Sequence, residues 1–229
     1  MDSFFSRSSL LIFCVWSAII IAFVAALLER QWPVAGLAFA AFLLTLVPFF
    51  VEDKLDINIP DSFLATIGLF IYATLILGES SDFYEKFWWW DTILHIGSSA
   101  GFGIIGFVIL LLLLQGKKLE ASAGLIGFFS FTFAVAFGAL WEIWEFTLDQ
   151  TLGLNTQKSG LPDTMGDLIV DSASAFVVAL SGYIYLKYGK KVLFVGVINE
   201  AFRKNAATFR AKFPKETKRE TLKDITPQK

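Results

Sequence analysis

Residues 88–114 read WWWDTILHIGSSAGFGIIGFVILLLLL, and this stretch decides the fold. A helix needs about 20 mainly apolar residues to cross the hydrocarbon core of a bilayer, and this stretch is long enough. Its apolar run is continuous rather than alternating, which is typical of a transmembrane helix and not of a strand in a membrane barrel. Asp91 and, four residues later, His95 interrupt it, and His95 is the only histidine of the chain.

The rest of the chain has the same character. Of its 229 residues 55% are hydrophobic, with 25 Phe and 7 Trp, which is more apolar than an ordinary soluble domain. The sequence therefore predicts an all-α polytopic membrane protein, with a six-helix transmembrane domain over residues 1–186. The single cysteine, Cys14, excludes an internal disulfide. The predicted spans cover roughly residues 9–28, 32–51, 61–77, 88–114, 123–148 and 163–186.

Residues 187–229 carry a net charge of +8, whereas the rest of the chain carries −10. They predict a basic tail, partly an amphipathic helix with a disordered end, that either contacts anionic lipid or is simply solvated. Six spans place both termini on one side, and the Lys and Arg excess of that side predicts that both are cytoplasmic, in a bacterial inner membrane. The expected partners are membrane lipids and not nucleic acid, and the oligomeric state is open.

Acidic residues gather where three spans reach the same face of the membrane, which is the extracytoplasmic face in this orientation. Within each span the spacing is three or four residues, so each set lies on one side of its helix. A rise of about 1.5 Å per residue predicts three layers, from the mouth inward. These are Asp91, Asp149 and Asp163, then His95, Glu145 and Asp167, then Glu142 and Asp171.

These three spans contain no Lys or Arg. An ionised side chain near the centre of a span costs on the order of 3 kcal/mol, so the acids must share protons or bind a cation. Mg²⁺, Mn²⁺ or Ca²⁺ would suit the oxygen ligands, whereas Zn²⁺ or Fe²⁺ would make more use of the histidine. A divalent metal is therefore the cofactor considered. The candidate metal ligands are Asp91, His95, Glu145 and Asp167, and the candidate catalytic residues are His95, Glu142 and Asp171.

Two structural interpretations compete with this one. Asp163 follows Pro162 and could simply cap the last span. The buried acids and the histidine could form a hydrogen-bond network with serines such as Ser98 and Ser99 that only holds the helices together.

Three motifs, DTILHIGSSAGFG, FGALWEIWEFTLD and DTMGDLIVDSASA, together resemble the YjdF family of small bacterial inner-membrane proteins. The resemblance covers residues 91–175 and implies no reaction, because the members are known mainly as proteins without an assigned function. It implies that the motif positions are Asp91, His95, Glu142, Glu145, Asp163, Asp167 and Asp171. The order of the acids is more distantly similar to that of VanZ-like membrane proteins, although this chain has Glu145 and no arginine where those proteins would offer glutamine and arginine.

Three functions remain open from the sequence. The first is a metal-dependent hydrolase or transferase that acts on a lipid or a lipid-linked envelope precursor. The second is a proton- or cation-coupled transporter, which the apolar inner halves of the three spans and the lack of an inverted repeat disfavour. The third is a structural or accessory subunit, so whether the protein is an enzyme is left undecided.

Overall fold

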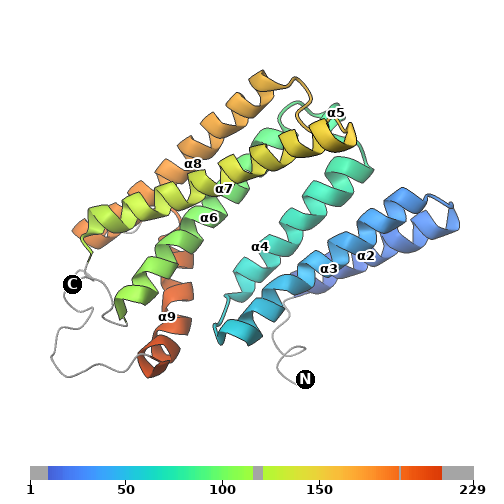
Figure 1. Ribbon diagram of the computed structural model, residues 1–229. Coiled ribbons are helices and arrows are strands. Elements are labelled where there is room, and N and C mark those ends of the chain that lie inside the picture. The colour runs from blue at the N-terminus through green and yellow to red at the C-terminus, as the bar shows by residue number, and fades with distance from the viewer. Residues whose placement is uncertain (1–9, 116–120, 191, 213–229) are drawn as a thin grey trace. The chain divides into compact units, whose positions relative to one another are not determined.

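The computed structural model describes residues 10–115, 121–190 and 192–212, and over these residues it is helical without a strand (Figure 1). One element, η1, is a π-helix, and it continues the helix before it. In chain order the elements are α2 (Leu10–Leu28), α3 (Trp32–Leu55), α4 (Asp61–Ile71), η1 (Tyr72–Ser80), α5 (Phe83–Lys86), α6 (Trp90–Gln115), α7 (Ala123–Leu152), α8 (Leu161–Tyr188) and α9 (Val195–Lys212).

Six of the described helical segments are long and apolar enough to cross a membrane, if α4 and η1 are counted together. This confirms the predicted all-α polytopic architecture. The helices extend past several predicted ends. The third span continues through the π-helix to Ser80, and α7 continues to Leu152, where Gly153 ends it with a φ of 68°. Glycine adopts this left-handed conformation without the strain that a Cβ atom would cause.

The chain divides into two compact units, and the division falls between Leu94 and His95, inside α6. In the first unit, α2 and α3 pack through small residues and share a buried cluster with η1. Trp16 on α2 donates a 2.9 Å hydrogen bond to the Thr45 hydroxyl on α3. An interhelical hydrogen bond of this kind helps to join helices where lipid gives no hydrophobic driving force. The buried cluster consists of Val15, Ile19, Ala38, Ala41 and Ile76.

In the second unit, α7 and α8 run side by side, and glycines bring α6 close to both of them (Figure 1). The Ser130 hydroxyl on α7 donates a 2.7 Å hydrogen bond to the carbonyl of Gly103 on α6. A Cβ atom added at Gly103 would lie 3.2 Å from Val178 on α8. Small residues at such crossings let helix backbones approach closely. This close packing determines which faces of α6, α7 and α8 meet at the end of the helices that carries the acidic residues.

Residues 161–188 form α8, which is longer at both ends than the predicted last span. It begins earlier because Pro162 occupies the first turn, where a proline is tolerated since its missing N–H would have no partner there. Beyond α8, residues 195–212 form α9, in which Val195 and Ile198 are buried. The disordered end expected for the tail lies outside the described residues.

The contact between Gly182 on α8 and Phe107 on α6 gives a test of this packing. A methyl group added at Gly182 would overlap the Phe107 ring, which is fully buried. We expect Gly182→Ala to destabilise the protein by about 1–3 kcal/mol, as overpacking does. Gly97→Ala is the matched control because it meets open space. It should be neutral or stabilise the protein by about 0.5–1 kcal/mol. Thermal unfolding in detergent measures both, and equal midpoints would show that the ring has room to move.

Candidate functional site

His95 lies in the second turn of α6 and is surrounded by carboxylates from the two neighbouring helices. Its side chain is 8% exposed. Nδ1 lies 3.3 Å from Asp171 Oδ2, while Nε2 lies 3.9 Å from Glu142 Oε1 and 3.9 Å from Asp167 Oδ2. The three helices that carry the predicted acidic residues therefore do meet, and the imidazole is at the centre of the contact. We call His95, Glu142, Asp167 and Asp171 the histidine cluster.

Backbone contacts hold α6 and α8 in register at this point. The Ser99 hydroxyl donates a 2.7 Å hydrogen bond to the carbonyl of Asp171, and the Ser174 hydroxyl donates a 2.8 Å bond to the carbonyl of Ile96. Asp167 and Asp171 are four residues apart on α8 and therefore share one face. The serine bonds turn that face toward His95.

Gly138 makes the space for Asp171 from the side of α7. A Cβ atom added at Gly138 would overlap the Asp171 carboxylate. Gly138 lies four residues before Glu142, so the two residues are on the same face of α7. The glycine thus lets α8 approach, and one turn later the glutamate points at the same histidine.

The contact with Asp171 selects one tautomer of the imidazole when this carboxylate is ionised. An ionised carboxylate can only accept hydrogen bonds, so in that state Nδ1 donates to Asp171. In the neutral imidazole the other nitrogen, Nε2, then carries a lone pair. That lone pair faces Glu142 and Asp167. A histidine whose far nitrogen donates to a carboxylate is the arrangement that most metal-bound histidines adopt.

Glu142 is the unusual member of the cluster. The residue is 4% exposed, and both of its carboxylate oxygens lie without a hydrogen-bond partner within the described part of the chain. The same holds for Asp171 Oδ1. Buried polar atoms normally find a partner, because a buried donor or acceptor without one costs about 1–3 kcal/mol. Free oxygens that face an imidazole lone pair suit a cation or a shared proton.

The surrounding helices offer no cationic side chain to balance this charge. Residues 88–115, 123–152 and 161–186 contain neither Lys nor Arg. Three acids therefore share one imidazole in the histidine cluster. Carboxylates this close cannot all stay ionised without compensation.

Asp91 lies one turn before His95 on the same continuous helix. Asp91, His95 and Asp167 each offer one ligand atom, and these atoms lie within 4.8 Å of one another. One nitrogen and two carboxylate oxygens at such separations could become ligands of one ion after small side-chain rotations. Three of the four predicted metal ligands thus lie together.

The fourth predicted ligand, Glu145, is half-buried and accepts a 3.1 Å hydrogen bond from Trp141 Nε1 on its own helix. Glu142, one turn earlier on α7, is the residue that the structure places 3.9 Å from His95. The predicted layers, which rest only on the rise per residue along each helix, place Glu145 in the layer of His95 and Glu142 one layer deeper. His95 instead reaches both inner layers, because the imidazole projects between helices and contacts residues of each.

Asp149 and Asp163 lie at the ends of α7 and α8, and neither behaves as a simple cap of its own helix. Asp149 accepts hydrogen bonds from the backbone N–H groups of Thr156 and Gln157 at 2.7 and 3.0 Å, so it ties the connection between the helices to the end of α7. The interpretation of Asp163 as the cap of α8 is wrong. Gly160 occupies the cap position without a side-chain cap bond, and Asp163 lies inside the first turn.

Comparisons with known proteins agree with the membrane architecture. The family model described as "Predicted membrane protein (DUF2238)" matches residues 8–188. A protein of Thermotoga maritima, described as uncharacterized, is 35% identical over 133 residues, which are 58% of this chain and 67% of that protein. No solved structure matches the chain.

The free oxygens of Glu142 give a stability test that needs no knowledge of function. In protein treated with a chelator, Glu142→Leu should raise the free energy of unfolding by about 1–3 kcal/mol, because it removes two buried acceptors without partners. Ser99→Ala should lower it by about 1 kcal/mol, because it removes the bond to the Asp171 carbonyl. Thermal unfolding in detergent compares the two variants. A loss of stability in Glu142→Leu would mean that the carboxylate has a structural role.

Proposed function

We propose, for a chain that belongs to the DUF2238 family of predicted membrane proteins, that the histidine cluster and Asp91 form the divalent-metal site of a membrane enzyme. One observation carries the proposal. The Glu142 carboxylate is buried, lacks a hydrogen-bond partner among the described residues and lies 3.9 Å from His95 Nε2. A buried acid without a hydrogen-bond partner, beside a histidine nitrogen, offers ligand atoms to a cation.

The donors suggest which ions fit. We assign the ligand positions to His95 Nε2, Asp167 and Glu142, with Asp91 as a further oxygen donor one turn away on α6. A mixed set of one imidazole and several carboxylates suits Zn²⁺, Mn²⁺ or Fe²⁺ better than Mg²⁺ or Ca²⁺, which favour oxygen ligands alone. Glu145, which the sequence favoured as the ligand on this helix, is the alternative that must be tested beside Glu142.

Asp171 has a different role in this proposal. It faces Nδ1 and not Nε2, so it positions the imidazole and raises its basicity instead of binding the ion. Replacement of such a partner typically weakens metal affinity by about 10–100-fold. The Ser99 bond to the Asp171 carbonyl supports this position in turn.

The substrates we propose are lipids or lipid-linked envelope precursors that carry a phosphoester or ester bond. A metal at this site would polarise the phosphoryl or carbonyl oxygen and lower the pKa of a bound water. The site lies at the end of α7 and α8 that carries the polar connection 153–160, so a substrate group at the membrane surface could reach it. A carboxylate that is not used as a ligand would accept the proton of the attacking water.

We place both termini in the cytoplasm, in the inner membrane of a bacterium, so that the site opens to the outside. The support is the excess of Lys and Arg on one side, which includes Lys54 and the stretch 187–212. Fusion of a reporter to the described C-terminal helix tests this orientation.

Metal content is the first test of the proposal. Elemental analysis of detergent-purified protein after exposure to Zn²⁺ or Mn²⁺ should find about one ion per chain. His95→Ala and Asp167→Asn should lose it, because each removes a ligand atom. Asp171→Asn should keep the ion with about 10–100-fold lower affinity.

Two matched variants on α7 decide which glutamate binds. Glu142→Gln should lose the metal, whereas Glu145→Gln should retain it, since Glu145 accepts a bond from Trp141. The reverse result would move the ligand to Glu145. Wild-type protein without any bound ion would overturn the metal site and leave a shared-proton network.

Activity is the second test. Purified protein in vesicles that contain a lipid phosphoester should release a water-soluble product in the presence of metal. His95→Ala should lower the rate by about 100-fold or more, because it removes a metal ligand and a possible proton acceptor. Exposed Glu29, which lies in the first unit, gives the control Glu29→Gln. Full function of Asp167→Asn in cells would contradict the enzyme and favour a structural network.

A further inference from the structure

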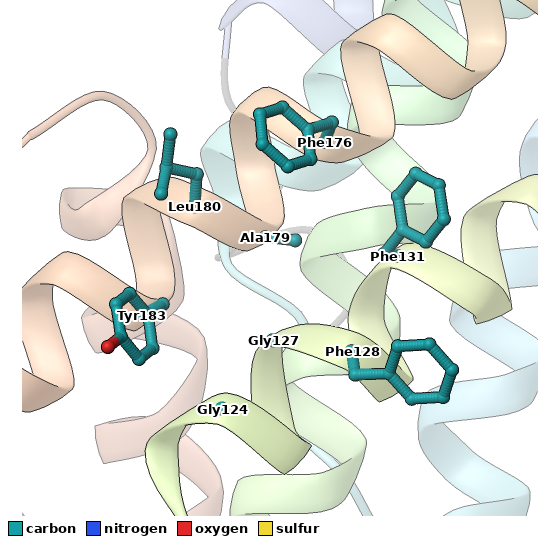
Figure 2. A pocket seen from close by; sticks show the side chains of 8 residues that line it. All are labelled: Gly124, Gly127, Phe128, Phe131, Phe176, Ala179, Leu180 and Tyr183. Atoms are coloured by element: carbon teal, nitrogen blue, oxygen red, sulfur yellow. The ribbon is translucent and has the colours of Figure 1, made fainter.

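A groove lies between α7 and α8, toward the end of these helices opposite the histidine cluster. Its volume is about 470 Å³. On α7 it is lined by Gly124, Gly127, Phe128 and Phe131. On α8 the lining residues are Phe176, Ala179, Leu180 and Tyr183 (Figure 2). The Tyr183 hydroxyl is the one polar side-chain group among them.

Small residues form the floor of the groove and aromatic rings stand beside it. A Cβ atom at Gly127 would lie 3.2 Å from the carbonyl oxygen of Ala179, so the two helices approach most closely there. At Gly124 the nearest atom to an added Cβ is the Ser122 hydroxyl at 3.9 Å, so this part of the groove is open. Phe128 and Phe176 are 64% and 57% exposed. In a transmembrane helix pair such a recess must be filled by a hydrocarbon chain or by another helix.

A cation lies one turn beyond the Tyr183 end of the groove. Lys187 Nζ donates a 2.6 Å hydrogen bond to the Tyr183 hydroxyl and lies 5.2 Å from the ring centres of both Tyr183 and Tyr188. Lys187 is exposed and forms no ion pair with a carboxylate in the part of the chain that the structure describes. Its charge is therefore free to attract an anion.

We propose that this groove binds one acyl chain of an anionic glycerophospholipid, whose phosphate contacts Lys187. The groove spans eight residues of each helix, or about 10 Å along the axis, with the cation at one end. This combination matches a molecule with a hydrocarbon tail and an anionic head. The described surface offers no such match to a second copy of the chain, which would bring the same lysine to the site.

Shape and charge must provide the selectivity of the groove. Bulk lipid tails are as apolar as the groove, so burial from water contributes nothing to binding. The gain comes from the close contacts that the recess makes around one chain, and from attraction between the lysine and the phosphate. The site is separate from the metal site, so either proposal can fail without the other.

Native mass spectrometry of the full-length protein in detergent tests the groove. The probes are dioleoylphosphatidylglycerol and dioleoylphosphatidylcholine, which have the same chains and different head groups. Gly124→Leu fills the open part of the groove and should lower the affinity for both lipids at least ten-fold. Gly36→Leu is the matched control, because Gly36 on α3 also faces open space and lies in the other unit. Phe128→Ala removes an exposed wall without a folding penalty and should weaken both lipids as well.

Lys187→Gln separates the contribution of the lysine charge to lipid affinity from that of the shape of the groove. It should lower the affinity for phosphatidylglycerol about five-fold and leave that for phosphatidylcholine unchanged. Lys190→Gln, which removes a nearby charge outside α8, should have a smaller effect. Unchanged lipid binding in Gly124→Leu and Phe128→Ala would overturn the proposal. If the wild-type protein is a dimer and Gly124→Leu makes it monomeric, the groove binds a second copy of the chain instead of a lipid. Metal content should stay the same in every groove variant.

Discussion

The acids buried where α6, α7 and α8 meet have a single imidazole beside them and no cationic side chain on the neighbouring turns of these three helices. His95 faces Asp171 with one nitrogen and Glu142 and Asp167 with the other. A charge in a low-dielectric interior is tolerated only with a partner, and these turns provide no lysine or arginine. The packing around the cluster serves this constraint. Gly138 leaves room for Asp171, and two serine hydroxyls fix α8 against the backbone of α6.

The fold could be predicted because a membrane span is encoded by the length of a continuous apolar run. Only the ends were uncertain, since Pro162 and Gly153 set the limits of α8 and α7 and lie in polar sequence. The site could be predicted in part. Helical periodicity placed the acids on shared faces and at one end, but it does not show how helices rotate toward each other. That is why periodicity could not show that Glu142 lies 3.9 Å from His95. The sequence signal for Glu142 was Gly138, four residues earlier on the same face of α7, because a glycine lets a neighbouring helix approach that face.

The two ends of the α7–α8 pair differ in chemistry. At one end, three carboxylic acids and an imidazole lie together where the helices are in close contact. At the other end, Gly124, Gly127 and Ala179 leave a recess between exposed aromatic rings. Both ends have a glycine where the two helices meet. Whether the space beside that glycine is filled depends on the neighbouring side chain. Next to Gly138 a carboxylate fills the space, whereas nothing from the described chain fills the space at Gly124.

The hydrogen bonds from the connection between α7 and α8 to the Asp149 carboxylate have a consequence for the order of assembly. Its bonds join residues seven and eight positions apart, whereas the contact between His95 and Asp171 joins residues 76 positions apart. Short loops close first, because the entropy lost on closure grows with loop length. The connection after α7 therefore closes on the end of that helix before the three helices meet at His95.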